Sequence, residues 1–248
     1  MIASFSRRLL FPALFTLAGL AVLISLGVWQ LHRKEWKEGL IATLERQITA
    51  KPVSLPDPSS DLLLGNAEFR RIALRAEFIK DAKPALLYTG ASALREDVKQ
   101  PGYFVFSPAR LADGRAVVIN RGYVPLDRTT EIADAPGEIT GYLRFPEKPG
   151  WFVAAHDTKG EVWFQRDPQA MAEIRQWGPV APFYIDQEAP VPAGGLPRPG
   201  KLAVHLRNDH LGYALTWFGL AGALAAVFAA WAIREWYLIT SSRPPASL

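Results

Sequence analysis

The chain has 248 residues, of which 28 are basic and 24 acidic, and its formal net charge is +4 at pH 7. The two signs of charge are interspersed along the sequence rather than gathered into a basic stripe, which argues against a nucleic-acid-binding protein. The chain has no cysteine, which excludes structural disulfides, thiolate catalysis and cysteine-ligated zinc or copper sites.

The first predicted element is a transmembrane helix over residues 9–31. It follows a short N-terminal tail of residues 1–8 and has no charged residue at any of its 23 positions. A helix of about 20 residues crosses the hydrocarbon layer of a bilayer, so this run is long enough. Its apolar part exceeds that of a cleaved signal peptide, which favours a retained anchor. Residues 32–51 then continue as an amphipathic helical extension, because apolar side chains recur at helical spacing between charges.

Residues 52–209 are predicted to form a β-rich extramembrane domain. Apolar and charged residues alternate over Arg70–Ile79, which is the pattern of a half-buried strand. Two apolar runs, Tyr103–Ser107 and Ala116–Asn120, flank Asp113-Gly114 and are typical of a hairpin. The remaining expected elements are strands at Ile139–Phe145, Val162–Gln165, Phe183–Ile185 and Leu202–Leu206 and a short helix at Pro168–Trp177.

A second transmembrane helix is predicted over residues 210–233. Leu211–Ile233 is again an uncharged run of 23 residues, and residues 234–248 form a C-terminal tail. The expected fold class is therefore a membrane protein in which two transmembrane α-helices flank a β-rich α+β extramembrane domain. Neither span contains Asp, Glu, Lys or Arg, which disfavours a transporter. The sequence has no nucleophile elbow, phosphate loop or HExxH arrangement, which argues against an enzyme.

In five places the sequence resembles the Surfeit locus protein 1 family, and the resemblance extends over nearly the whole chain. The matching groups are Gly27-Val28-Trp29-Gln30 with Arg33, Pro101-Gly102-Tyr103, Asn120-Arg121-Gly122-Tyr123-Val124-Pro125, Trp163-Phe164-Gln165-Arg166-Asp167, and Arg207-Asn208-Asp209-His210-Leu211-Gly212-Tyr213-Ala214-Leu215-Thr216-Trp217. Their order between two terminal spans is the specific feature. The chain is similar to bacterial-type members of this family, because the short region before Leu9 leaves little room for a mitochondrial presequence.

What the resemblance implies is an assembly factor for haem-copper oxidases, especially cytochrome c oxidase. Such a factor helps haem a reach, or remain placed in, subunit I of the oxidase. The implied partners are subunit I, other oxidase assembly factors and membrane lipid, with no nucleic acid. The implied location is a bacterial inner membrane, with the central domain in the periplasm. The alternative is a cofactor-free membrane scaffold that stabilises an oxidase assembly intermediate through protein contacts.

The resemblance also implies that His210 binds haem a. A neutral imidazole can donate a nitrogen lone pair to haem iron, and His is a common axial ligand. On a helix, His210, Tyr213 and Trp217 fall near one face, where the two aromatic rings offer surface to a flat macrocycle. The predicted site is therefore His210 as the iron ligand with Tyr213 and Trp217 beside it, and no catalytic residue is expected. The alternative is that His210 is a hydrated interface residue and its alanine neighbours serve helix packing.

Three other groups have structural interpretations beside functional ones. Asn120-Arg121-Gly122 either contacts the oxidase or satisfies a turn, and the turn is favoured. Arg166-Asp167 is expected to form a local ion pair or to begin a helix. Trp29-Gln30 and Arg33 either contact the second helix or a cofactor, or form an aromatic and cationic membrane border.

The other three histidines have weaker claims to ligand roles. His32, His156 and His205 lack a compelling ligand constellation, so we expect them to be structural or surface residues. His210 remains the single candidate metal ligand among the four histidines.

Overall fold

The computed structural model describes residues 2–55, 67–129, 137–147, 161–203 and 207–241. The chain divides into two compact units. The first, which we call the helix pair, comprises residues 1–41 and 206–248. The second, which we call the β domain, comprises residues 42–205.

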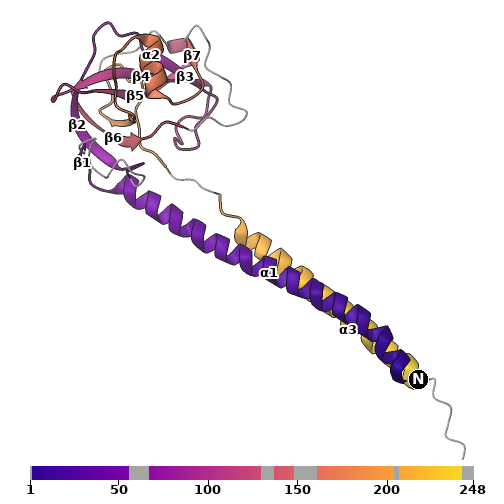
Figure 1. The fold of residues 1–248 in the computed structure, drawn as a ribbon. Coiled ribbons are helices and arrows are strands. Elements are labelled where there is room, and N and C mark those ends of the chain that lie inside the picture. The colour runs from indigo at the N-terminus through magenta and orange to yellow at the C-terminus, as the bar shows by residue number, and fades with distance from the viewer. Residues whose placement is uncertain (1, 56–66, 130–136, 148–160, 204–206, 242–248) are drawn as a thin grey trace, which may run out of the picture. The chain divides into compact units, whose positions relative to one another are not determined.

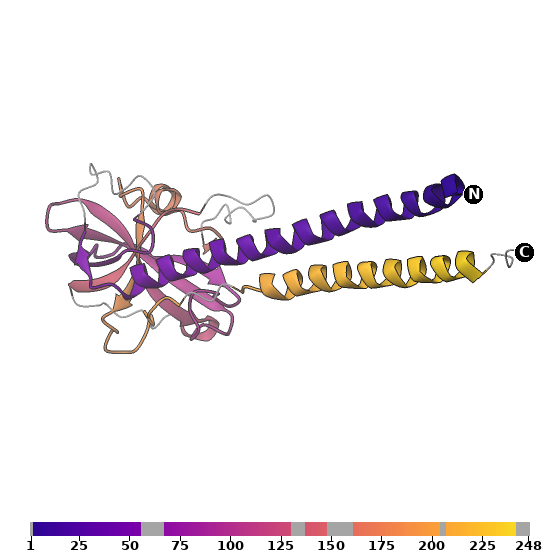
Figure 2. The ribbon, with the colours of Figure 1, turned by 90° about the horizontal axis from the view of Figure 1, so that it is seen from below.

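The helix pair consists of two long helices, α1 (Ile2–Thr49) and α3 (His210–Ser241), which run side by side (Figures 1 and 2). Each contains a stretch long and apolar enough to cross a membrane, and only 6% of that stretch is buried within the molecule. The core helix of a soluble domain would instead bury most of its apolar surface. These are therefore membrane-spanning helices, as predicted. α1 continues without a break from the predicted span through the predicted amphipathic extension.

The β domain is built on one sheet (Figure 1). Its strands are β1 (Val53–Ser54), β2 (Arg71–Phe78), β3 (Ala85–Thr89), β4 (Gly102–Leu111), β5 (Ala116–Pro125), β6 (Glu138–Arg144), β7 (Val162–Trp163) and β8 (Tyr184–Ala189). Their order is β1-β2-β6-β8-β5-β4-β3-β7, and β2 also pairs with β4. This last pairing closes β2, β6, β8, β5 and β4 into a ring. Closure pairs both sides of each ring strand, where an open sheet would leave exposed edges.

The two faces of the ring strands contribute to two different apolar clusters. Along β5, Val117 and Ile119 belong to the first cluster, whereas Val118 between them belongs to the second. The first cluster takes residues from all five ring strands, which is the arrangement of a barrel interior. The second packs beneath α2 (Pro168–Arg175), where Met171 is fully buried. A short 3₁₀ helix, η2 (Leu126–Arg128), follows β5.

Most of the predicted elements are confirmed. β2 buries alternate residues over the predicted Arg70–Ile79 strand, and β4 and β5 form the predicted antiparallel hairpin. The helix predicted at Pro168–Trp177 is α2, while β6, β7 and β8 lie within or overlap the other expected strands.

Two features of the sheet differ from the prediction. β3 was not predicted, because polar and apolar residues do not alternate along Ala85–Thr89. The strand expected at Leu202–Leu206 is wrong at Leu202 and Ala203, which lie outside the sheet. Leu202 instead packs with Ile48 in a small apolar cluster. Residues 204–206, including His205, lie outside the described residues, as does His156.

Candidate functional site

The first turn of α3 carries the predicted haem ligand. α3 begins at His210, and the Tyr213 backbone N–H donates to the Asp209 carbonyl oxygen at 3.3 Å in its first turn. Asp209 also forms an ion pair with Arg207. The side-chain oxygen of Asn208 is buried and finds no hydrogen-bond partner within the described part of the chain. His210 is therefore presented at a defined helix start that is rich in polar groups.

The His210 ring is held by a residue of the other helix. Its Nδ1 lies 2.7 Å from the side-chain oxygen Oε1 of Gln30, across 180 residues of sequence. An amide oxygen can only accept a hydrogen bond, so the Nδ1–H of the imidazole donates. In the neutral ring this leaves the lone pair on Nε2, and a neutral imidazole nitrogen of this kind is what a metal accepts.

Close packing of the two helices creates this contact. Gly27 lies one turn before Gln30, and a Cβ at Gly27 would fall 2.5 Å from the ring of Phe218. Ala214 is almost completely buried on the facing side of α3. The Lys37 ammonium of α1 donates to the backbone carbonyl of Arg207, three residues before α3 begins. Small residues at a membrane helix interface permit this approach.

The three predicted site residues lie in the first two turns of α3 and differ in exposure. His210 and Trp217 are both partly buried and share a row of α3 with the buried Ala214. Tyr213, three residues after His210, is 58% exposed.

The motif around Gln30 divides between two interpretations. Gln30 contacts the second helix through His210, which was one of the two alternatives. Trp29 is 55% exposed, and the guanidinium of Arg33 lies 4.0 Å from the centroid of the Trp36 ring. These residues fit the aromatic and cationic border instead. The sequence named Gln30 as a candidate contact, but its partner was not predicted because the two residues are far apart in the chain.

In the β domain, Asn120 is engaged by the fold itself. Its Nδ2 donates to the Asp186 carboxylate at 2.6 Å, and its Oδ1 accepts from the backbone N–H of Gly122 at 3.2 Å. The other oxygen of Asp186 accepts from Arg144 at 3.0 Å. Asn120, Arg144 and Asp186 are all buried, so these polar groups satisfy one another inside the domain.

Gly122 has a backbone conformation that favours glycine. Its φ is +118°, and an added Cβ would overlap the backbone carbonyl of Arg198. That approach accompanies a two-way backbone pairing between Tyr123 and Arg198, with N–O distances of 3.0 and 2.8 Å. The turn expected at Asn120-Arg121-Gly122 is wrong, because the segment lies within β5, where its pairing with β4 is irregular. The contacts of Asn120 and Gly122 are nevertheless structural, and Gly122 supplies the backbone freedom that was expected.

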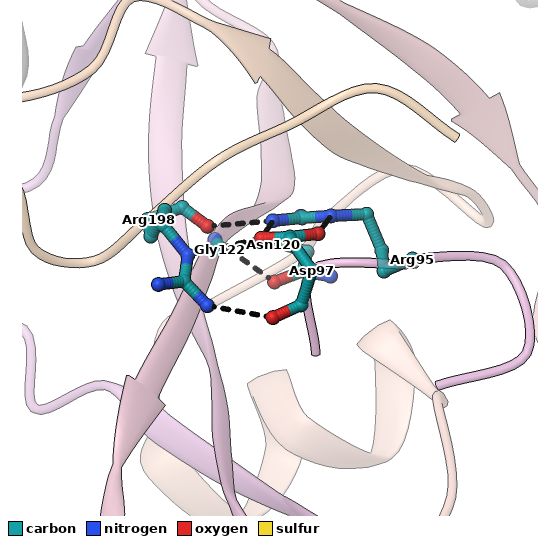
Figure 3. Close-up of polar contacts among 5 residues, drawn as sticks. All are labelled: Arg95, Asp97, Asn120, Gly122 and Arg198. Carbon is teal, nitrogen blue, oxygen red and sulfur yellow. Dashed lines mark hydrogen bonds and ion pairs between the residues drawn. The ribbon is translucent and has the colours of Figure 1, made fainter. Parts of the chain in front are cut away.

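A second ion cluster fastens the loop before β4 to the segment that contains Arg198 (Figure 3). The Asp97 carboxylate accepts from Arg95 at 2.8 Å through each oxygen and from Arg198 at 2.9 Å. Arg95 also donates to the Arg198 carbonyl at 3.1 Å. The hydrogen bond from Arg95, and then the positive charge of both guanidinium groups, lowers the pKa of Asp97 below its ordinary 3.8. This cluster therefore strengthens as Asp97 ionises.

The Arg166-Asp167 pair is confirmed in its structural role. The carboxylate of Asp167 accepts from the backbone N–H groups of Gln169 and Ala170 at 3.0 and 3.1 Å and so caps α2. Arg166 pairs with Glu147 at 2.5 Å rather than with its neighbour.

The polar centre of the β domain encloses only a small cavity. Its volume is about 20 Å³, and its lining includes Arg95, Arg144, Arg166 and Gln187. Sites for cofactor-sized molecules occupy roughly 300–1,000 Å³. This cavity is therefore too small for a macrocycle.

Similar proteins are known from several organisms. A sequence profile described as "SURF1 family" matches residues 17–222. A SURF1-like protein of Monosiga brevicollis is 33% identical over 221 residues, which cover 84% of this chain and 82% of that protein. A SURF1-like protein of Drosophila melanogaster is 34% identical over 221 residues, which cover 82% and 71%. Surfeit locus protein 1 of Homo sapiens is 33% identical over 215 residues, which cover 80% and 70%.

Proposed function

The chain belongs to the SURF1 family, and on that premise we propose that it is a non-enzymatic assembly factor for a haem-copper (cytochrome c) oxidase that handles haem a through His210. The observation that carries the haem assignment is the contact between His210 Nδ1 and Gln30 Oε1 at 2.7 Å. It occupies one ring nitrogen and leaves the other able to bind iron.

The helix pair offers the groups that a haem cargo needs. Haem iron accepts an axial imidazole, and Nε2 of His210 is the nitrogen that would supply it. The exposed ring of Tyr213 and the partly buried ring of Trp217 add aromatic surface nearby.

The location of His210 suits transfer within a membrane. It is the first residue of a membrane-spanning helix, at the boundary where an apolar macrocycle can stay in lipid while its polar edge stays hydrated. We place the protein in a bacterial inner membrane with the β domain in the periplasm. Subunit I of the oxidase, which receives haem a, is the expected partner there.

Haem retention tests the ligand assignment. The protein would be co-produced with the haem a synthesis enzymes, purified in detergent, and analysed by absorbance and pyridine haemochrome. We expect wild type to retain haem a and His210→Ala to lose it. His32→Ala is the matched control, because the His32 side chain is 75% exposed on α1. Unchanged haem content and an unchanged spectrum in His210→Ala would reject the assignment.

Partner identification tests the assembly role separately. Affinity isolation from native membranes should recover subunit I with the wild-type protein, and haem extraction of the same sample should detect haem a. Wild type that recovers subunit I but contains no haem would favour the cofactor-free scaffold. Failure to recover any oxidase component would contradict the assembly function itself.

A further inference from the structure

Gln30 contacts the candidate iron ligand, His210, from the other helix. It lies on α1, whereas His210 begins α3, yet the two side chains meet at 2.7 Å. We infer that Gln30 is a positioning residue that holds His210 with its proton on Nδ1 and so makes Nε2 the nitrogen that ligates haem iron. The part of this inference that concerns haem rests on the proposed function, whereas the part that concerns the imidazole does not.

The hydrogen bond selects one form of the ring. The oxygen of Gln30 has no proton to give, so it stabilises the tautomer in which Nδ1 carries the proton. The same bond restrains rotation of the ring about its own axis. Groups that hold a metal-binding histidine in this way typically change metal affinity by about 10–100-fold when removed. Gln30 therefore acts on haem through His210 and needs no contact with the macrocycle.

Helix packing determines where the Gln30 oxygen lies. Gly27 lets the ring of Phe218 come against α1 one turn away, which brings the two backbones close together. At a membrane border an amide without a partner is costly, and the imidazole supplies that partner. The pairing is thus favourable for Gln30 even before haem is bound. The site is organised in advance, which lowers the entropic cost of binding.

Tautomer measurement in haem-free protein tests the first half of the inference. Magnetic resonance of ¹⁵N-histidine-labelled full-length protein in lipid bilayers distinguishes protonated from unprotonated ring nitrogens. The His210 signals are assigned from their loss in His210→Ala. We expect Nδ1 to be protonated in wild type and the proton to redistribute towards Nε2 in Gln30→Leu. A wild-type ring protonated on Nε2, or a ring unaffected by Gln30→Leu, would overturn the inference.

A matched variant separates ring positioning from helix pairing. Lys37→Leu removes a polar contact between α1 and the Arg207 carbonyl, just before α3, without touching the imidazole. We expect this variant to keep the wild-type tautomer and haem affinity. If Lys37→Leu changed both as much as Gln30→Leu does, Gln30 would act only through helix pairing, and the inference would fail.

Haem titration tests the second half. Gln30→Leu should weaken haem a binding by about 10–100-fold and shift the midpoint potential of the bound iron. Gln30→Glu keeps an acceptor and should restore binding, while its negative charge lowers the midpoint potential relative to wild type. If wild type and His210→Ala behave as proposed but the two Gln30 variants match wild type in affinity and potential, the inference fails alone. If wild type binds no haem a, the proposed function fails while the tautomer measurement still decides the contact.

Discussion

The β domain and the helix pair use the polar side chains that bond within them in opposite ways. In the β domain, Asp186 is fully occupied by Asn120 and Arg144, and all three lie inside the protein. In the helix pair, Gln30 occupies Nδ1 of His210, and within the described residues no contact is found for Nε2, which can therefore bind a ligand. The polar motifs of this chain therefore have two roles. Some stabilise the fold, and others retain an atom that can bind a ligand.

The largest effect expected from this comparison is at Gly122. Gly122→Val should destabilise the protein by about 4–5 kcal/mol or more, because the side chain meets the Arg198 backbone at a φ of +118°. Gly114→Ala is the control, since its φ is +86° but no atom lies within 4 Å of the added Cβ, and about 1 kcal/mol is expected. Urea denaturation in detergent, followed by circular dichroism, measures both. Equal losses at the two glycines would show that the close approach at Gly122 is unimportant.

Removing the buried carboxylate of Asp186 should have the next largest effect. Asp186→Ala leaves the Arg144 guanidinium without this buried partner, and a loss of about 3–5 kcal/mol in the free energy of unfolding is expected. Haem bound per folded molecule should stay the same, because the residue serves the fold. A variant of normal stability that had lost haem would break the division between the two units.

The reverse experiment enlarges a residue of the helix pair. Gly27→Leu collides with Phe218 and moves Gln30 away from His210. We expect haem a affinity to fall about tenfold, equivalent to about 1.4 kcal/mol. The unfolding midpoint of the β domain should not change. The division between the units would be contradicted if that midpoint fell while haem affinity stayed constant.

A smaller loss is expected at the cap of α2. Asp167→Ala removes the carboxylate that accepts from two backbone N–H groups, which should cost about 1 kcal/mol in unfolding free energy. Asp167→Asn keeps an acceptor and should recover most of it. If Asp167→Ala reduced haem retention without this loss of stability, the residue would have a role beyond the fold.

The smallest effect is the pH dependence contributed by Asp97. Because Arg95 and Arg198 lower the pKa of Asp97 in the folded state below 3.8, the ionised form stabilises the fold above that pH and the contribution disappears as pH falls through the folded-state value. The side chain is 43% exposed, so solvent screening limits the contribution to less than about 1 kcal/mol. The free energies of unfolding of Asp97→Asn and wild type should therefore differ at pH 7 and converge as the pH falls through the lowered pKa of Asp97. A difference that persisted in acid would assign it to packing.

The sequence predicted the parts of the fold that depend on local pattern. The uncharged runs located both spans, alternation located β2, and Asp113-Gly114 located the β4–β5 hairpin. Closure of the ring through β2 and β4 was not predicted, because pairing between strands depends on twist and distant contacts rather than on local pattern.

The candidate site was predictable only in part for the same reason. His210 could be singled out by chemistry and by resemblance, and Gln30 by its place at the end of the predicted first span. Their contact joins residues 180 positions apart and required the packing of the two helices to be known. Tyr213 was grouped with His210 on helical spacing. Spacing alone does not predict how exposed a side chain is, and Tyr213 is largely exposed.

Direct detection of the iron–histidine bond is the sharpest test of the central claim. Full-length protein labelled with ¹⁵N-histidine and loaded with haem a would be studied by electron–nuclear hyperfine spectroscopy. We expect a histidine nitrogen coupled to the iron in wild type and in His32→Ala, and its loss in His210→Ala. A coupling that survives the loss of His210, or iron in wild type with no histidine coupling, would contradict the assignment of the haem site to the start of α3.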